Sequence, residues 1–332
     1  LEAYQVAVVT ESPRMVMNWK GQKIADLSRE FLNTNGAVKH ANLCVEKKDR
    51  TALGQASVHS LKELAASLKS ASRRGLTERF DGSIGAGSVL MPFGGKTQRT
   101  PAQAMAALFP VEPNQETDQA SVMAWGCDPD QLSVDPYSGA HSAVYTSMAK
   151  IVAAGADYKK AYLTLQEFFE KLRNEPQRWG KPFSALLGAL DAQLELGAAA
   201  IGGKDSMSGS FLDKDVPPTL ISFAIAPIQG QQVLSPEFKA ADHPVYLFRS
   251  EDTKSAWEAF HALCEAGKVK AAWAVENGLA EAVMKMSFGN RIGFLVDPRL
   301  ESDPFWDPTP GAIVAECGRE IPGALLLGYT SD

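Results

Sequence analysis

One apolar stretch constrains the fold more than any other feature of the sequence. Residues 219–226 read TLISFAIA, a near-continuous apolar run. Such a run is typical of a strand that is buried on both faces. Around it the sequence predicts further strands at 120–125 and 161–165 and a short helix at 166–173. Amphipathic helices are expected at 139–154 and 182–196, the first of them ending at Gly155.

The second half of the chain alternates between strand and helix patterns. Strands are predicted at 245–248, 269–275, 292–296 and 312–317, and helices at 255–266 and 279–288. Such alternation is typical of an α/β fold. The proline-containing segment 227–243 marks a boundary before this half.

The N-terminal residues predict a small β-meander. Strands are expected at 3–9, 14–19 and 23–27, with a turn at Lys20-Gly21. The meander is too short to be a domain, so it resembles the tail of one. Because the chain begins with Leu1 and not Met, we expect a processed start or a piece of a longer protein.

A polar, irregular linker is predicted at residues 33–59. A helix follows it, starting at the capping box formed by Ser60 and Glu63 and ending at Gly75.

Composition excludes several classes of protein. With 332 residues the chain is long enough for two domains, at ~100–200 residues each. Its net charge of -6 argues against nucleic acid as the main partner. The four cysteines are widely spaced, which indicates reduced thiols in a cytoplasmic protein and no zinc ribbon. We expect no membrane span, no signal peptide and no histidine-based metal site.

A glycine-rich turn carries the clearest sign of chemistry. Residues 202–209 read GGKDSMSG and follow a short apolar strand. The glycines allow close approach of a ligand, Lys204 can meet a phosphate, and the serines offer hydroxyl groups. Spacing alone favours the simpler interpretation, a solvated turn with an ion pair between Lys204 and Asp205.

Longer motifs resemble one family. The strings GGKDSMSGSFL, WGKPFSALLGALDAQLELG, AYLTLQEFFEKL and RFDGSIGAGSVLMPFGGKTQRTPAQAM are together similar to phosphoribosylformylglycinamidine synthase in its long single-chain form. That family consists of ATP- and glutamine-dependent carbon–nitrogen ligases of purine synthesis. The resemblance runs from about Val6 to Gly293.

The resemblance implies an architecture. The synthetase core of the family holds two copies of an aminoimidazole-ribonucleotide-synthetase-like (AIR-synthetase-like) unit, and the motifs match the second. Residues 1–32 would end the preceding domain, and 33–75 would be a linker and helix. The N-terminal half, which forms a barrel by pairing, would be 76–228. The α/β C-terminal half would be 229–332 and is expected to be truncated.

The missing parts of the family's enzyme define the expected partners. The first synthetase copy and the glutaminase domain lie outside this chain, so no residue here is assigned a catalytic or metal-binding role. The resemblance implies ATP and magnesium in the complete enzyme, with neither firmly bound by this piece alone. We expect the isolated chain to be inactive and to form a homodimer that imitates the pair of copies.

The resemblance also implies binding residues for nucleotide and substrate. Within the turn, Gly203 would approach the nucleotide, Lys204 its phosphate and Ser206 the substrate. Thr164, Gln166 and Glu167 match a loop that approaches the same nucleotide. Two of these positions depart from short-chain relatives, since Lys204 replaces an asparagine and Thr164 an aspartate. A lysine opposes direct metal ligation, so we expect Lys204 to contact phosphate.

A second cleft departs further from the family. Some long-chain relatives bind an auxiliary nucleotide and magnesium there through acidic side chains and an asparagine. The matching positions here are Gly126, Thr146, Lys150 and the segment 275–278. Because magnesium prefers oxygen ligands, we expect no such site in this chain.

Three questions stay open at this point. The basic, glycine-rich arm at 79–100 could cradle phosphates or could pack on the missing copy. The chain could also be a structural or interaction module without chemistry of its own. A third alternative is another member of the superfamily, such as a selenophosphate synthetase or thiamin-phosphate kinase, although LTLQEFF and GGKDSMSGSF argue against it.

Overall fold

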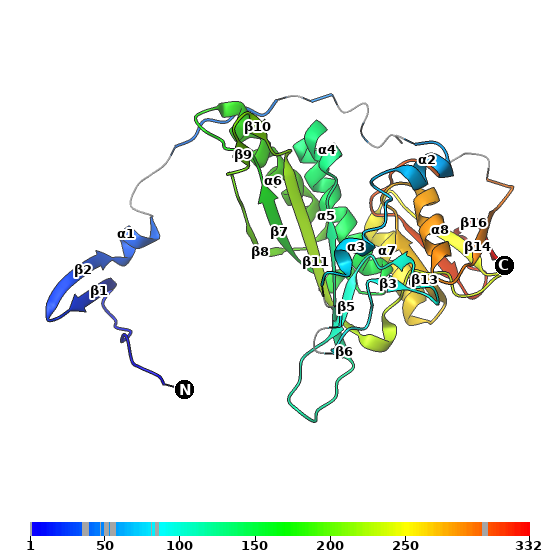
Figure 1. The fold of residues 1–332 in the computed structure, drawn as a ribbon, viewed down its shortest axis with the longest axis horizontal. Coiled ribbons are helices and arrows are strands. Elements are labelled where there is room, and N and C mark those ends of the chain that lie inside the picture. Colours follow the sequence, from blue (N-terminus) through cyan, green and yellow to red (C-terminus); the bar gives the residue numbers. More distant parts are fainter. Residues whose placement is uncertain are drawn as a thin grey trace. The chain divides into compact units, whose positions relative to one another are not determined.

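The computed structural model of the chain describes residues 2–34, 40–46, 48–49, 53, 58–80, 82–83, 86–300 and 305–332. The chain divides into two compact units, residues 1–43 and residues 44–332. Figure 1 shows the helices and strands of each. In the described part, no helix combines the length and the apolar character that crossing a membrane requires.

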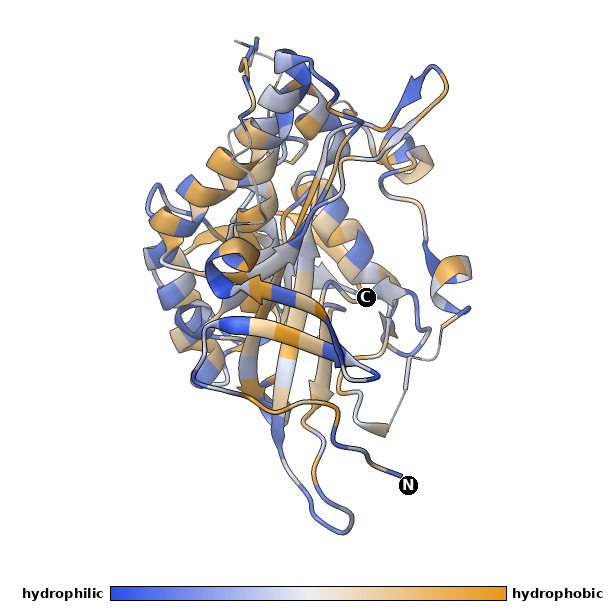
Figure 2. Cartoon of the chain, turned by 90° about the vertical axis from the view of Figure 1, so that its left-hand side faces the viewer, coloured by the Kyte–Doolittle hydropathy of each residue, from blue (hydrophilic) through white to orange (hydrophobic). Residues whose placement is uncertain are grey.

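The first unit is a β-hairpin followed by one helical turn. Strands β1 (Arg14–Trp19) and β2 (Gln22–Ser28) pair antiparallel. Lys20 and Gly21 connect them with φ of 49° and 77°, the left-handed backbone that a two-residue hairpin turn requires. The expected turn is therefore present. Both strands carry a mixture of apolar and polar residues, visible as orange and blue in Figure 2.

The strand predicted at 3–9 is not formed. Residues 2–10 have no regular structure, and no strand in the described part of the chain pairs with them. A strand needs a partner for its backbone hydrogen bonds, so alternation alone does not create one. Ser28 ends the hairpin and caps helix α1 (Arg29–Asn33) by accepting from the Phe31 N–H at 3.1 Å.

The second unit begins with short helices. Helix α2 (Leu61–Ala66) starts at Ser60, whose hydroxyl accepts from the Glu63 N–H at 3.3 Å. The predicted cap is correct, but the helix ends at Ala66, and Gly75 lies inside the separate helix α3 (Arg74–Thr77). Only Leu64 of α2 is buried, so too little apolar surface packs to extend the helix.

Five strands form the first sheet, in the order β5-β6-β11-β7-β8. Their bounds are Met105–Leu108, Gln119–Gly126, Thr219–Gln229, Tyr162–Phe168 and Ala200–Lys204, respectively. All neighbours pair antiparallel except β7 and β8, which are parallel. Strand β7 continues through the residues predicted as the start of helix 166–173, because β11 and β8 pair with it on both sides.

Helices α5 (Pro136–Ala153) and α6 (Pro176–Leu196) pack against each other, and α5 packs on β11 and β6 (Figure 1). Helix α4 (Pro129–Val134) leads into α5. The first positions of α5 and α6 are prolines, which suit the first turn, and both helices start earlier than predicted. Gly155 follows α5 with φ of 102°, as expected of a residue that ends a helix.

Strand β11 is not buried on both faces. Leu220, Ser222, Ala224 and Ala226 are buried on the face covered by α5, whereas Ile225 on the opposite face is 37% exposed. The prediction of double burial was therefore wrong for this chain. The strand carries apolar residues on both faces, but the helices of this chain cover only one.

The second sheet has the order β13-β15-β12-β16-β14, with every neighbouring pair antiparallel. In that order its strands are Val269–Ala274, Ile313–Cys317, Pro244–Phe248, Leu325–Ser331 and Gly293–Val296. Helices α7 (Thr253–Glu265) and α8 (Leu279–Phe288) pack on it. Strand β16 was not predicted. The α/β fold class is confirmed.

Two small hairpins and two 3-10 turns complete the elements given for the described residues. The hairpins are β3 (Phe93–Gly94) with β4 (Thr100–Pro101) and β9 (Ser210–Phe211) with β10 (Lys214–Asp215). The 3-10 turns are η2 (Tyr158–Lys160) and η3 (Gly230–Gln232).

The basic arm ends in the β3–β4 hairpin, which packs on the end of α8. The Thr97 N–H donates to the Gly289 carbonyl at 2.8 Å, and the Thr100 hydroxyl donates to the Lys285 carbonyl at 2.6 Å. Gly95 has φ of 83°, and a Cβ there would lie 2.3 Å from the Gly289 carbonyl carbon. The arm was expected either to cradle phosphates or to pack on the missing copy, and neither expectation included this contact with α8 of the same chain.

Candidate functional site

Parallel pairing of β7 with β8 brings predicted site residues together. Gln166 lies opposite Lys204, and Thr164 lies opposite Gly202. On the other side of β7, Gln166 pairs with Ile221 and Thr164 with Phe223 of β11. Residues opposite one another share a face of a sheet, so Thr164, Gln166 and Lys204 lie on the face that the helices leave open.

Backbone hydrogen bonds hold the turn that follows β8 against the end of β7. The Ser206 N–H donates to the Glu167 carbonyl at 3.1 Å, and the Phe169 N–H donates to the Ser206 carbonyl at 2.9 Å. The Gly209 N–H donates back to the Phe169 carbonyl at 2.9 Å. The Gln166 side-chain amide also donates to the Glu167 carbonyl, at 2.9 Å. Ser206 and Gln166 are therefore positioned by one carbonyl group.

The two glycines of the turn have different surroundings. A Cβ on Gly203 would lie 2.6 Å from the Leu165 carbonyl oxygen, so the close pairing of β7 and β8 requires glycine there. A Cβ on Gly202 would meet nothing within 4 Å. Gly203 thus has a structural role in the sheet, and the open space for a ligand lies at Gly202.

Lys204 is exposed and has no ion-pair partner among the residues that the structure describes. The ion pair with Asp205 that a solvated turn would contain is thus not formed. The Ser206 and Ser208 hydroxyl groups are 2.9 Å apart and hydrogen bonded to each other. A free ammonium group and two hydroxyl groups on an ordered turn can bind an anion such as a phosphate.

Glu167 lies apart from the other site residues. It is 4% exposed and pairs with buried Leu220, so its side chain is on the face of the sheet that the helices cover. Its Oε1 atom has no hydrogen-bond partner in the described structure. Burial, with a smaller contribution from Asp205, raises the pKa of Glu167 from 4.5 to about 7. The structure therefore separates Glu167 from Thr164 and Gln166, and only its carbonyl group serves the turn.

The raised pKa predicts a pH-dependent stability. Between pH 4.5 and about 7 the folded protein binds more protons at Glu167 than the unfolded chain does, so this contribution to stability falls as pH rises. Glu167→Gln removes this dependence. Between pH 5 and pH 8 its free energy of unfolding should therefore rise relative to that of the wild type by on the order of 2–3 kcal/mol. Urea unfolding of both proteins at the two pH values measures it. An equal pH dependence in both proteins would contradict this placement of Glu167.

Positions that the resemblance assigns to the second cleft form a buried network. Lys150 of α5 is 3% exposed, and its ammonium group lies 2.8 Å from Glu276 Oε2 and donates to the Trp125 carbonyl at 2.9 Å. The same ammonium group lies 4.3 Å from the centre of the Trp125 ring. Gln103 donates to Glu276 Oε1 at 3.1 Å. Lys150 and the segment that contains Glu276 were expected from the sequence to matter here, whereas Trp125 and Gln103 were not.

The glycine at position 126 has a packing reason. A Cβ there would lie 2.1 Å from the Ala143 carbonyl oxygen and 2.7 Å from the Ser147 nitrogen, both in α5. Strand β6 thus approaches the helix too closely for any side chain at this position. Among the described residues, no group of three or more histidine, cysteine, aspartate or glutamate side chains could hold a metal ion.

Comparison with known proteins supports the resemblance seen in the motifs. No protein-family profile matches the chain. It is 21% identical over 345 aligned residues to the phosphoribosylformylglycinamidine synthase subunit PurL of Thermoplasma acidophilum, covering 95% of this chain and 44% of that protein. The chain therefore spans less than half the length of this curated relative.

Solved structures show the same fold. The Thermotoga maritima PurL complexed with ATP superposes with a TM-score of 0.64 at 16% identity, over 97% of this chain and 49% of that one. The T. maritima PurL complexed with FGAR gives a TM-score of 0.61 at 16% identity, over 97% and 48%. The resemblance to phosphoribosylformylglycinamidine synthase and the synthetase-like α/β fold are thus confirmed.

Proposed function

We propose that this chain is the second synthetase copy of a phosphoribosylformylglycinamidine synthase, an ATP- and glutamine-dependent ligase that converts formylglycinamide ribotide to formylglycinamidine ribotide. The observation that carries the proposal is the ordered turn with Lys204 and Ser206 beside Gln166, in a chain similar to PurL along nearly its whole length. A cytoplasmic location fits the four cysteines, all of which are free.

The proposed domains follow the predicted boundaries. Residues 1–32 end the preceding domain, 33–75 are linker and helix, 76–228 form the barrel-pairing half and 229–332 the C-terminal half. The two sheets support this division, because the first ends with β11 at Gln229 and the second starts with β12 at Pro244.

The chemistry assigned to these residues is binding and positioning. In the proposed reaction ATP phosphorylates the formyl-amide oxygen, and ammonia from glutamine then displaces the phosphate. Lys204 would bind the phosphate charge, while Ser206 and Gln166 would orient the substrate; reactions of this kind depend on position and charge stabilisation. We propose that the first synthetase copy supplies the magnesium ligands, since no group of three or more histidine, cysteine, aspartate or glutamate side chains among the described residues could hold a metal ion.

Replacing Lys204 tests the proposal in the complete enzyme. Lys204→Ala should lower kcat/KM on the order of 10–100-fold, because it removes a charge-assisted contact to phosphate. Lys214→Ala is the matched control, since Lys214 is exposed in the nearby β9–β10 hairpin. Unchanged kcat/KM in Lys204→Ala would refute the role given to the turn.

A second candidate function is a structural module without chemistry of its own. The absence of a metal-binding group among the described residues favours it for the isolated chain. Calorimetry of the isolated chain with ATP and magnesium separates the two, because tight, metal-dependent binding would exclude a purely structural role. The two candidate functions are compatible if this chain is the non-catalytic half of the enzyme.

The open face of the first sheet is the proposed contact with the other copy. It carries exposed apolar side chains on adjacent strands: Met105 at 55%, Trp125 at 46%, Tyr162 at 53% and Ile225 at 37%. Extended apolar surfaces of this kind mark contacts with other protein chains. We therefore propose that another copy, or the first synthetase copy of the enzyme, covers this face.

The isolated chain should consequently form a homodimer. Light scattering at micromolar concentration should give twice the monomer mass for the wild type and the monomer mass for Ile225→Lys. Leu194→Lys is the control, since Leu194 is 72% exposed on α6 and not on the sheet. A monomeric wild type would count against the proposed contact.

A further inference from the structure

A cavity of about 270 Å³ lies at the opposite end of β11 from the candidate site. Its floor is the end of β11, Pro227–Gln229, and α7 and the 3-10 turn η2 form its sides. Thr219–Ile221, at the other end of the strand, pair with β7 next to the turn of Lys204. The two ends are separated by about eight residues, or roughly 25 Å at the usual rise of a strand.

The polar groups of the cavity are not used by the protein. The side-chain amides of Gln119, Gln229 and Gln232 line it, and none has a hydrogen-bond partner within the described ranges. The Nδ1 atom of His261, another lining residue, is also unpartnered in the described structure. Amide groups offer both a donor and an acceptor, so they complement a ligand whose edge alternates between the two.

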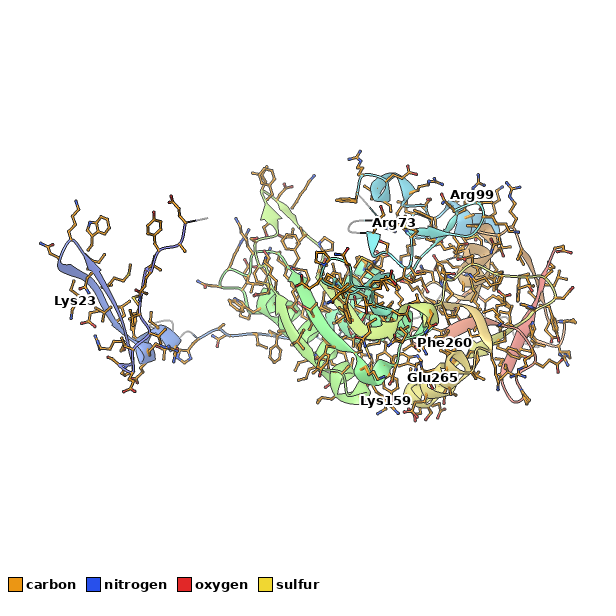
Figure 3. All side chains as sticks on the ribbon, turned by 90° about the horizontal axis from the view of Figure 1, so that it is seen from below. Lys23, Arg73, Arg99, Lys159, Phe260 and Glu265 are labelled. Atoms are coloured by element: carbon orange, nitrogen blue, oxygen red, sulfur yellow. The ribbon has the colours of Figure 1, made fainter. Side chains whose placement is uncertain are left out.

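The lining carries charged groups of both signs. Asp157 and Glu265 are acidic, whereas Lys160 is basic, and His261 Nε2 lies 3.7 Å from Glu265 Oε1. Glu265 and Lys159, the neighbour of Lys160, lie near each other along the lower edge of the larger unit in Figure 3. A lining of mixed sign favours a ligand without net charge over a polyanion such as a triphosphate.

An apolar wall completes the cavity. Phe109 is 40% exposed, and Pro227 and Ile228 lie beside it in the lining. The Phe109 N–H donates to the Gln119 carbonyl at 2.8 Å, so these two lining residues are neighbours across the cavity wall. An aromatic ring for stacking, together with amides for the edge, is the usual chemistry of base recognition.

We propose that this cavity binds a nucleobase or an uncharged nucleoside. Its volume is slightly below the roughly 300–1,000 Å³ of sites for larger ligands, which matches a molecule of this size. Phe109 stacks on the base, and Gln119, Gln229 and Gln232 bond its edge. The inference does not depend on the proposed function, because none of these residues belongs to the turn of Lys204.

Calorimetric titration of the chain with adenosine, guanosine, cytidine and uridine tests the inference. At least one of them should bind saturably. Phe109→Ala should weaken that binding about tenfold by removing the stacking surface. Gln229→Leu should weaken it to a similar extent by removing the amide, and it serves as the second variant if Phe109→Ala does not fold. Gln177→Leu, on the exposed side of α6, should bind as the wild type does.

Three results would overturn the inference. The first is the absence of saturable binding of all four nucleosides at millimolar concentration. The second is binding that neither cavity variant weakens. The third is binding that Lys204→Ala abolishes, which would place the nucleoside at the candidate site; wild-type affinity in Lys204→Ala is the expected result.

Discussion

Replacing Lys150 with methionine should lower the free energy of unfolding by about 3 kcal/mol, because it leaves a carboxylate without its partner in a poorly hydrated place. The ammonium group of Lys150 is the shared partner of Glu276 and of the Trp125 carbonyl. Glu276 keeps a quarter of its side chain exposed, so we expect the lower end of the range for broken buried pairs. Chemical denaturation measures the effect.

A surface pair provides the matched control. Lys159 lies 2.9 Å from Glu258, but these side chains are 59% and 49% exposed, so Lys159→Met should cost less than about 1 kcal/mol. Adding Glu276→Gln to Lys150→Met should recover part of the lost stability, because the unpaired charge is then gone. Equal effects of Lys150→Met and Lys159→Met would show that the Lys150 network contributes little.

Gly126→Ala should destabilise the protein by about 3 kcal/mol or prevent its folding. The added methyl group would lie 2.1 Å from the Ala143 carbonyl oxygen and 2.7 Å from the Ser147 nitrogen. Both atoms belong to the backbone of α5 in the core, which cannot move aside as a flexible side chain can, and overpacking of this kind typically costs about 1–3 kcal/mol or more.

Gly202→Ala is the control for this substitution, since its methyl group would meet nothing within 4 Å. We expect its free energy of unfolding to stay within about 0.5 kcal/mol of the wild type. Thermal denaturation of the two variants compares them directly. A tolerated Gly126→Ala would mean that β6 and α5 are less closely packed than described.

These two predictions explain a departure from the family in physical terms. Gly126 and Lys150 are positions where the resemblance implies metal ligands in some relatives. Here the first allows a strand to touch a helix, and the second ties that strand's end to Glu276 beyond β13. The contact of β6 with α5 at Gly126 and the ammonium group of Lys150 thus occupy the positions where some relatives bind an auxiliary nucleotide.

Local hydrophobic patterns predicted correctly those helices and strands that are specified by their own residues. The bounds of α8, Leu279–Phe288, agree with the prediction; β6 is longer than predicted by one residue at each end, and β12 by one residue at its start. The helix expected at 166–173 failed because pairing with β8 and β11 overrides the helical preference of QEFFEKL. The residues of β8 that pair with β7 lie 37 or 38 positions further along the chain, so no local pattern contains this outcome.

The site was predictable in its parts but not in its geometry. The motifs identified Thr164, Gln166 and Lys204, and parallel pairing places them on one face of the sheet. Alternation along β7 already implied that Glu167 would point to the other face, but a strand had first to be recognised there. Gln103 and Trp125 carried no signal, because their partners Glu276 and Lys150 are distant in sequence.

Hydrogen exchange of the complete enzyme, with and without ATP, tests the central claim most directly. The claim is that the turn after β8 contacts the nucleotide. We predict that ATP slows exchange of the backbone amides of residues 202–208, and that Lys204→Ala weakens this protection. ATP binding that leaves the exchange of these amides unchanged would contradict the claim.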